Sequence, residues 1–480
     1  MNSNGVEIPN KQYQQSKDCV DLMRDAYIGS PAVKSEEKRK IYLAPSALNQ
    51  EWTYEEQIRY KRYVSRAEFD NIPSNTVGSL LGGAFRIQPT VELPAQLAVM
   101  ENNADGDGLE LSEMLKIATS ELLQMEYVGL LAEYVGMSNL NVDEVSVTDS
   151  QSAQPAIKIY TRENIIGWQF SRVNGKLQLS ELRLKQCEEL SRESGTYETE
   201  EIDAYIVLAL DENGYYYQKK YVGGTVDEWS EEYYPLKMGQ RFDYIPFEFC
   251  IAADYAKGHI PLKMGYVYDI AVKTIARYQT NADLKEALYF SGAPFTTSSG
   301  WDSQAQEMYK EMTGHSCIMA LPGSHLPMPE GVTFDIKAWS GEGNAIFKYL
   351  TQNEAEIRAL GGVFDTTDGE AQETATAASI KIAEKQGALT QIVGSVESSF
   401  IRVLGYCAEF VGASESNIEM GREFSASKIT PQERDAIRND YMQGLIGREE
   451  ALAQLEKGGV LTKDAETIIL ESSSTLDTLE

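Results

Sequence analysis

Three histidines have the clearest potential for metal chemistry, because imidazole is a common metal ligand and the chain contains only three of them. His259, His315 and His325 lie in one part of the chain, and Cys317 stands close to His315. A zinc site needs four ligands at characteristic spacings. No fourth ligand completes such a pattern here. We therefore interpret the histidines as isolated residues and predict no metal site.

The run from Asn103 to Gly108 alternates oxygen-bearing side chains before a glycine, as the first half of a calcium loop does. Such a loop ends on a carboxylate that binds the ion with both oxygens, and Met114 occupies that position. We instead interpret Asp105 and Asp107 as acids near the start of a helix over 109–126, because the helix dipole favours negative charge there.

Carboxylates could also supply acid and base catalysis, but with 73 Asp and Glu no single pair stands out. The chain has no Gly-x-Ser-x-Gly elbow, no Walker loop and no His-Glu-x-x-His motif. We therefore predict no catalytic residue and no cofactor. An acid-surfaced soluble hydrolase acting on carbohydrate stays open as an alternative, because tyrosines and carboxylates are abundant.

Charge and cysteine usage limit the partners and the compartment. The net charge of −30 argues against a surface that holds DNA or anionic lipid by broad attraction. The five cysteines, at positions 19, 187, 250, 317 and 407, have no paired spacing, which predicts reduced core residues and an intracellular origin. No window is apolar enough for a membrane span, and residues 1–10 do not resemble an export signal.

The elements that carry these residues form an α+β pattern. From 156 to 221 the apolar residues alternate, and Asn174-Gly175 and Asn213-Gly214 predict two tight hairpins in an antiparallel meander. The acidic segment 188–201 between the hairpins is predicted to be an exposed connection. Helical spacing returns later and predicts a helix over 264–290 and another over 344–360, with a small strand-and-helix unit over 295–338 between them. Two short helices are predicted over 430–457.

The longest helical pattern runs from Thr374 to Val411 without a proline, and its apolar residues form one continuous stripe. At 1.5 Å per residue it would be a rod roughly 55 Å long. A polar, acidic run precedes it. The residues of interest in that run are Asp365, Thr366, Thr367, Asp368, Gly369, Glu370 and Glu373.

Several phrases occur in a fixed order along the chain. They are Tyr54–Arg62 with Phe85-Arg86 and Pro89, Asp107-Gly108 before a helix ending near Gly129-Leu130-Leu131, Glu163–Trp168, Tyr244–Phe247, and Glu373–Ala377. Together with the element order, they resemble the podovirus-type branch of tailed-bacteriophage portal proteins. The resemblance covers roughly residues 54–411, and the segment after Gly412 is similar only in its helical pattern.

The resemblance implies a portal-like α+β fold with seven regions. These are a wing over 1–261, a first stem helix over 262–291, a clip over 292–341, a second stem helix over 342–361, a channel loop over 362–373, a long wing helix over 374–412, and a crown with a C-terminal tail over 413–480.

The resemblance also implies a role without enzyme activity. Portal proteins form a ring, usually of twelve subunits, at the unique capsid vertex, where DNA is packaged and later ejected. The implied partners are double-stranded DNA, terminase, head-tail adaptor or tail proteins, and the major capsid and scaffolding proteins. The implied location is the virion, after assembly in the host cytoplasm. A different head-completion or tail adaptor ring is a further alternative, and it should lack the clip insert.

Site residues follow from the same resemblance. The acidic run before the rod would face DNA, and its charge would repel the duplex and keep it centred, whereas tight phosphate contacts would act as brakes. Lys348 and Arg358 would be weak positive positions on the stem. The predicted docking residues of the clip are Trp301, Asp302, Gln306 and Lys310. The alternative for the acidic run is a loop whose charges only interact with solvent.

Overall fold

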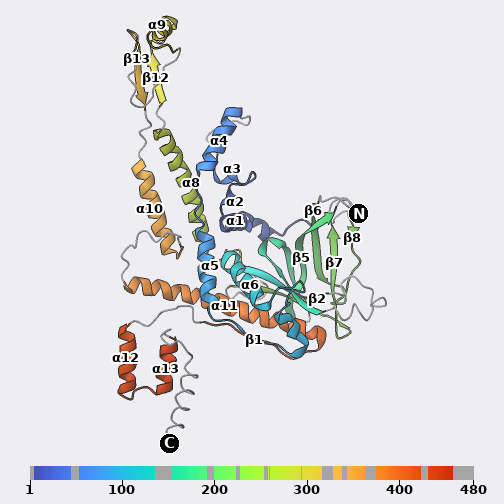
Figure 1. Ribbon diagram of the computed structural model, residues 1–480. Coiled ribbons are helices and arrows are strands. Elements are labelled where there is room, and N and C mark those ends of the chain that lie inside the picture. Colours follow the sequence, from blue (N-terminus) through green and yellow to red (C-terminus); the bar gives the residue numbers. More distant parts are fainter. Residues whose placement is uncertain are drawn as a thin grey trace. The chain divides into compact units, whose positions relative to one another are not determined.

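The computed structural model divides the chain into two compact units, which we describe separately. It describes residues 5–44, 53–135, 154–173, 175–191, 199–222, 228–252, 258, 260–292, 295–315, 328–337, 343–363, 375–422 and 431–457. The first unit holds Met1–Gln14, Gly78–Lys263 and Gln372–Glu480, and the second holds Gln15–Val77 and Met264–Ala371. Residues 15–77, which the sequence places in the wing, thus belong to the second unit. Helices and antiparallel sheets together give the predicted α+β class (Figure 1).

A five-stranded antiparallel sheet forms one layer of the first unit, in the order β4-β5-β6-β7-β8. Its strands are β4 (Ile165–Val173), β5 (Lys176–Ser191), β6 (Thr199–Leu210), β7 (Tyr216–Val222) and β8 (Glu228–Trp229). Both predicted hairpins are confirmed. In the second turn the Asp211 carboxylate accepts the N–H groups of Asn213 and Tyr215, at 2.9 and 2.8 Å. Gly214 lies between these two residues with φ of 83°, which suits a glycine.

The acidic segment 188–201 lies partly in strands, so its prediction as a connection between hairpins was wrong, whereas its predicted exposure stays a prediction. Strand β5 continues to Ser191 and β6 begins at Thr199, with Glu189 opposite Glu201 in the ladder. A ladder pairs backbone N–H and C=O groups, which every non-proline residue carries. An acidic sequence can therefore extend a hairpin that more apolar neighbours have started.

A three-stranded antiparallel sheet, in the order β11-β2-β3, forms a second layer of the same unit. It consists of β2 (Tyr127–Val135), β3 (Gln154–Tyr160) and β11 (Phe247–Ile251), and α6 (Leu111–Met125) leads directly into β2. The Phe249 ring lies 6.1 Å from Tyr127 and 6.2 Å from Trp168, so aromatic packing joins the two sheets. Gly129 is required here, because a Cβ would lie 2.3 Å from the Phe247 ring.

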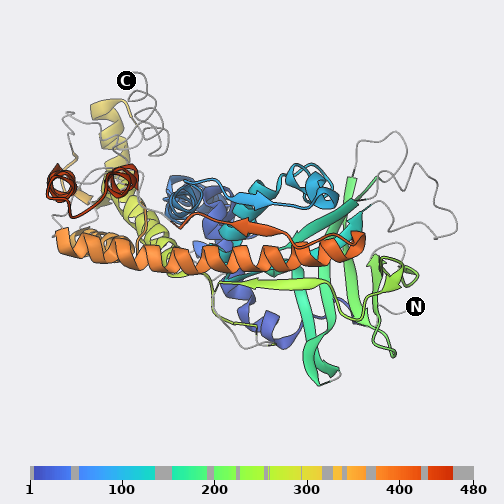
Figure 2. The same ribbon diagram turned by 90° about the horizontal axis from the view of Figure 1, so that it is seen from below.

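Helix α11 (Ala375–Val411) confirms the predicted rod and packs on the three-stranded sheet (Figure 2). Its stripe residues are almost fully buried: Leu389, Ile392, Val393, Val396, Phe400, Val403, Leu404 and Cys407. Cys250 and Cys407 are buried free thiols, as predicted, and burial raises the pKa of Cys250 to about 12. Cys187 is exposed and Cys19 is only partly buried, so the core prediction was wrong for these two residues.

Smaller elements complete the first unit. They are β1 (Thr90–Glu92), which pairs with β14 (Asn417–Glu419), the β9 (Leu236–Lys237) and β10 (Gln240–Arg241) pair, and the 3-10 helices η1 (Ala95–Glu101) and η2 (Arg162–Asn164). Two further helices, α12 (Pro431–Met442) and α13 (Arg448–Lys457), form the predicted pair near the C-terminus, and Gly444 with φ of 72° lies between them.

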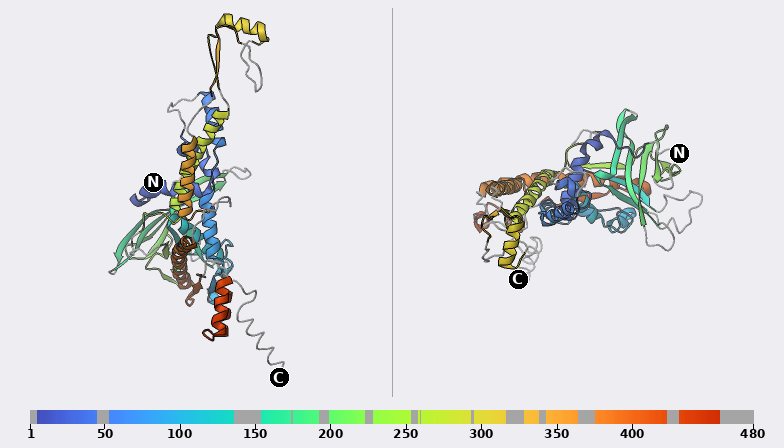
Figure 3. Two further views of the ribbon diagram at one scale, coloured as in Figure 1. Left: turned by 90° about the vertical axis from the view of Figure 1, so that its left-hand side faces the viewer. Right: turned by 90° about the horizontal axis from the view of Figure 1, so that it is seen from above.

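The second unit is mainly helical, and its strands belong to one small hairpin. Its elements are most of α1 (Lys11–Ile28), α2 (Ser30–Val33), α3 (Arg39–Tyr42), α4 (Tyr54–Arg66), the first part of α5 (Ile72–Ala84), α8 (Tyr268–Gly292), β12 (Phe295–Ser299), α9 (Ser303–Thr313), β13 (Thr333–Lys337) and α10 (Gly343–Ala359). Thr53 and Glu56 form a capping box at the start of α4. Figure 3 shows β12 and β13 side by side, with α9 following β12.

Candidate functional site

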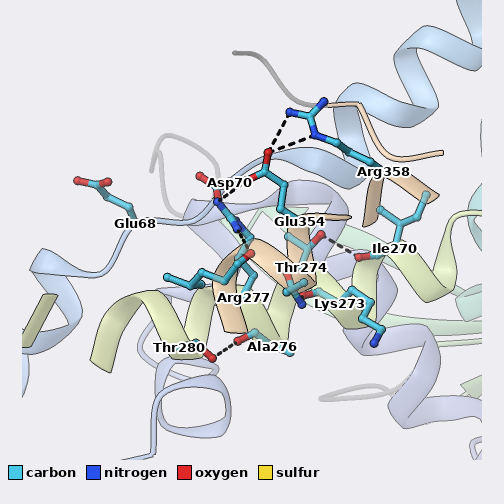
Figure 4. Close-up of polar contacts among 12 residues, drawn as sticks. Glu68, Asp70, Ile270, Lys273, Thr274, Ala276, Arg277, Thr280, Glu354 and Arg358 are labelled. Carbon is cyan, nitrogen blue, oxygen red and sulfur yellow. Dashed lines mark hydrogen bonds and ion pairs between the residues drawn. The ribbon is translucent and has the colours of Figure 1, made fainter. Parts of the chain in front are cut away.

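The helix pair α8 and α10 carries the residues that the sequence assigns to the stem, and Arg277 of α8 is central to it. Its Nε lies 2.7 Å from the Asp70 carboxylate, which stands just before α5 (Figure 4). Its Nη1 donates to the backbone carbonyl of Leu350 on α10, at 3.2 Å. One guanidinium therefore links α8 both to α10 and to the segment that leads into α5.

A second cross-link lies further along the same pair of helices. Lys273 forms an ion pair with Glu356, and the buried Asn353 amide donates to the Lys273 carbonyl at 3.2 Å. The hydrogen bond between the two side chains raises the pKa of Lys273 and lowers the pKa of Glu356. Both shifts favour the charged pair, so the two groups stabilise each other.

Lys348 and Arg358, the two predicted stem cations, have different surroundings. Arg358 interacts with Glu354 on its own helix, with Nη2 3.0 Å from the carboxylate (Figure 4). Lys348 is exposed and has no ion-pair partner among the residues the structure describes. Most of the Arg358 charge is thus compensated locally, and Lys348 is the more available of the two cations.

Charged and aromatic contacts also fix α4 against α8. The Tyr63 hydroxyl donates to the Asp283 carboxylate at 2.7 Å. Burial raises the pKa of Tyr63, and this hydrogen bond raises it further, so the phenol keeps its proton. Arg66 pairs with Glu286 and places its guanidinium 4.1 Å from the centre of the Tyr289 ring. Helix α8 is therefore held by α4 as well as by α10.

Two glycines and a chain of hydrogen bonds fix the turn that follows α10. Gly361 has φ of 92°, and a Cβ on Gly362 would lie 2.4 Å from the Ile357 side chain. The Val363 N–H donates to the Thr76 hydroxyl at 3.0 Å, and that hydroxyl donates to the Ile72 carbonyl at 2.7 Å. The predicted loop residues Asp365, Thr366, Thr367, Asp368, Gly369, Glu370 and Glu373 lie outside the described residues.

The small unit of β12, α9 and β13 occupies the region predicted as the clip. Asp302 caps α9 by accepting the Ala305 N–H at 2.9 Å, and the Trp301 ring packs edge-on against Tyr309 at 5.3 Å. Gln306 and Lys310 are exposed on α9. Two of the four predicted docking residues thus stabilise the unit itself, and the other two present side chains to solvent.

Of the four residues considered for metal chemistry, His315 alone belongs to the described part of the chain. His315 is exposed, whereas His259, His325 and Cys317 lie outside the described residues. No group of three His, Cys, Asp or Glu in the described part of the chain is arranged to hold a metal ion. Within that part, no helix combines the length and apolar character that a membrane crossing needs.

The acidic turn before α6 differs from the prediction. The helix begins at Leu111, and Asp105 is bound within the turn, where its carboxylate accepts the Asp107 N–H at 2.8 Å and the Leu109 N–H at 3.0 Å. Burial raises the pKa of Asp105, but these N–H groups outweigh it and lower the pKa overall. Asp107 pairs with Lys158 at 2.6 Å. The two acids thus shape the turn rather than the helix terminus.

Arg162 is a residue that the sequence analysis missed. It is 1% exposed, and its Nη1 donates to the carbonyls of Met125 and Lys263, both at 2.7 Å. The guanidinium also lies 4.7 Å from the centre of the Tyr127 ring. It therefore ties the end of α6 to the segment that precedes α8. Nothing in the sequence distinguishes Arg162 from the other lysines and arginines nearby, so its burial could not be predicted.

Comparisons with known proteins give three results. A family described as "Domain of unknown function (DUF4055)" matches residues 266–411. No curated protein matches the chain. Among solved structures, the neck of a native GTA particle computed with C12 symmetry is similar over 88% of this chain and 99% of that chain, at 14% identity and a TM-score of 0.42.

A second solved structure, the neck of an empty GTA particle computed with C6 symmetry, is similar over 87% of this chain and 98% of that chain. Its identity is 13% and its TM-score is 0.41. Both TM-scores are below 0.5, and the proposal below therefore rests on the elements of the chain itself.

Proposed function

We propose that this chain is the subunit of a portal ring, the head-to-tail connector of a phage-like virion. The order of elements is the observation that carries the proposal. An α+β unit is followed by α8, the β12-α9-β13 insert, α10, and then the 37-residue α11. This order is the one implied by the sequence phrases that resemble portal proteins.

The insert distinguishes a portal from the other ring proteins considered. A head-completion or tail adaptor ring should lack a folded unit between the two stem helices. Here β12 and β13 pair in register from Phe295 opposite Lys337 to Ser299 opposite Thr333, and α9 is capped at both ends by Asp302 and Gly314. A unit with its own hairpin and caps supports the portal assignment over the adaptor alternative.

The stem chemistry supports a wall along which DNA slides. Basic side chains of α8 are compensated: Lys273 by Glu356, and Arg277 by Asp70. Arg358 of α10 is compensated by Glu354, whereas Lys348 of the same helix is exposed without an ion-pair partner among the described residues. Each free cation on a channel wall would add a phosphate contact and slow the movement of DNA. Paired cations keep the helices together without adding such contacts.

In the proposed ring, residues 362–373 form the channel loop, and the anchor at Val363 fixes where this loop begins. The β12-α9-β13 unit is the docking surface for terminase and for head-tail adaptor or tail proteins. We further propose a twelve-subunit ring at the capsid vertex that contacts major capsid and scaffolding proteins. It would be assembled in the host cytoplasm, and the chain would not be an enzyme.

The loop is tested by deleting residues 365–370. The variant should assemble normally but should package less DNA or lose it after packaging, measured as nuclease-protected DNA per particle. Replacing Asp365, Asp368 and Glu370 by lysine should slow packaging, because phosphate contacts are added. A Thr366→Ser, Thr367→Ser variant serves as the matched control. Normal packaging by the deletion variant would refute the channel role of the loop.

The docking surface is tested at exposed positions that do not stabilise the unit. Gln306→Ala with Lys310→Ala should weaken binding of terminase or adaptor in a pull-down with purified partners. Lys61→Ala, an exposed change on α4, should leave that binding unchanged. Asp302 is not a suitable position for this test, because loss of its N-cap would cost about 1 kcal/mol and disturb α9 itself. Unchanged binding by the double variant would place docking elsewhere.

A further inference from the structure

A polar cavity in the first unit has no part in the proposed portal role. Its volume is about 950 Å³, within the range of pockets that bind small molecules. Its wall comes from β2 and β3 of one sheet, from β5–β7 of the other, and from the segment that follows β8. The wall residues that matter here are Glu133, Lys158, Tyr160, Lys219, Lys220 and Tyr233.

Glu133 is the unusual residue of this wall. Its carboxylate has no hydrogen-bond or ion-pair partner among the described residues, and the residue is half-buried in the cavity wall. Burial raises the pKa of Glu133, and the charge of Lys158 only partly opposes this. An ionised carboxylate without a partner is costly to bury. A positively charged ligand in the cavity would supply the partner that the described residues do not.

Two phenols, those of Tyr160 and Tyr233, line the same cavity as this carboxylate. The Tyr160 hydroxyl accepts a hydrogen bond from the Gln186 amide at 2.9 Å. Burial raises the pKa of Tyr160 and of Tyr233, and the nearby charge of Glu133 raises both further. Glu133, Tyr160 and Tyr233 all line the same cavity. Phenol oxygens can accept hydrogen bonds from an ammonium group, and the ring faces attract cations.

Two of the three lysines that line the cavity are paired with carboxylates. Lys158 lies 2.6 Å from the Asp107 carboxylate, and Lys219 lies 3.7 Å from the Glu232 carboxylate. Lys220 also has an interaction partner. Lys158 and Lys219 are therefore paired with carboxylates, whereas the Glu133 carboxylate has no such partner among the described residues.

We propose that this cavity binds a small organic amine, with the Glu133 carboxylate as the counter-ion of an ammonium group and the Tyr160 and Tyr233 hydroxyls as acceptors. A short aliphatic diamine fits this chemistry: one ammonium group pairs with Glu133, and the chain with its second ammonium group extends toward the exposed Glu231 carboxylate. The proposal is independent of the portal assignment.

Isothermal titration calorimetry with 1,5-diaminopentane tests the proposal on the full chain, at about 0.15 M salt to screen binding to the acidic surface. The protein should bind the diamine saturably at one site per chain. Glu133→Gln should weaken binding about tenfold or more, because a charged hydrogen bond is lost. Glu212→Gln is the matched control, since it removes one charge at an exposed turn, and its affinity should stay within about twofold of the parent.

A stability measurement separates loss of the site from loss of the fold. Glu133→Gln should unfold at the same temperature as the parent protein or a higher one, because it removes a carboxylate without a partner. The diamine should raise the unfolding temperature of the parent and of Glu212→Gln, but not of Glu133→Gln. Equal diamine affinity in the folded Glu133→Gln variant would overturn the proposal, as would the absence of saturable binding to the parent.

Discussion

Arg277→Met offers the sharpest test of how the helix pair is held together. The substitution keeps an aliphatic side chain but removes the guanidinium. It thereby removes a charged hydrogen bond to Asp70 at 2.7 Å and a bond to the Leu350 carbonyl at 3.2 Å. The Asp70 carboxylate is 41% exposed, so solvent screening limits its bond to about 1 kcal/mol. The bond to Leu350 adds about 1 kcal/mol.

Glu354 contributes little to this estimate. It lies 3.9 Å from Arg277 and already interacts with Arg358 at 3.0 Å. We therefore expect Arg277→Met to lower the free energy of unfolding of the second unit by about 2 kcal/mol. Combining it with Asp70→Asn in a double-mutant cycle should give a coupling of about 1 kcal/mol.

Urea unfolding is the assay, and hydrogen exchange of the amides around Leu350 reports where the loss occurs. Lys348→Met is the control on the same helix pair, because Lys348 is exposed without an ion-pair partner among the described residues. It should change stability by less than about 0.5 kcal/mol. If both variants behaved alike, or if the cycle showed no coupling, Arg277 would not hold α8 to its neighbours.

Three further predictions follow from named contacts. Phe400→Ala should destabilise the first unit by about 3–5 kcal/mol in urea unfolding, because the ring is fully buried against the sheet; a loss below about 1 kcal/mol would contradict this packing. Thr76→Val should speed hydrogen exchange at the Val363 amide, which loses its acceptor, and an unchanged rate would count against the anchor. Pairing with Lys273 lowers the pKa of Glu356. The pair therefore stabilises the folded protein at pH values above the usual glutamate pKa, and this stabilisation is lost as the pH falls through the lowered pKa. The urea midpoints of Glu356→Gln and the parent should therefore differ at pH 7 and converge in acid, and a pH-independent difference would contradict the pairing.

Local features were the most predictable from sequence. Gly214 takes a positive φ in the turn between β6 and β7, which suits a glycine, so the hairpin could be identified without any distant contact. The apolar stripe of α11 has helical spacing over its whole length, and burial follows directly from it. The small strand-and-helix unit was also predicted over 295–338, close to the observed span from the start of β12 to the end of β13.

Long-range features were less predictable. Arg277 pairs with Asp70, 207 residues away, and nothing local separates that aspartate from many others in so acidic a chain. Arg162 is buried only because three carbonyls converge on it, which a sequence pattern does not reveal. The cavity around Glu133 is likewise built from strands far apart in sequence.

Mass photometry of the purified full chain tests the central claim most directly. The portal proposal predicts particles many times the monomer mass of 53.5 kDa, about twelve times for the expected ring, and ring-shaped projections by negative-stain microscopy of the same sample. Particles of 53.5 kDa at every concentration tested, with glycosidase activity in the same sample, would contradict the portal proposal and favour the carbohydrate hydrolase.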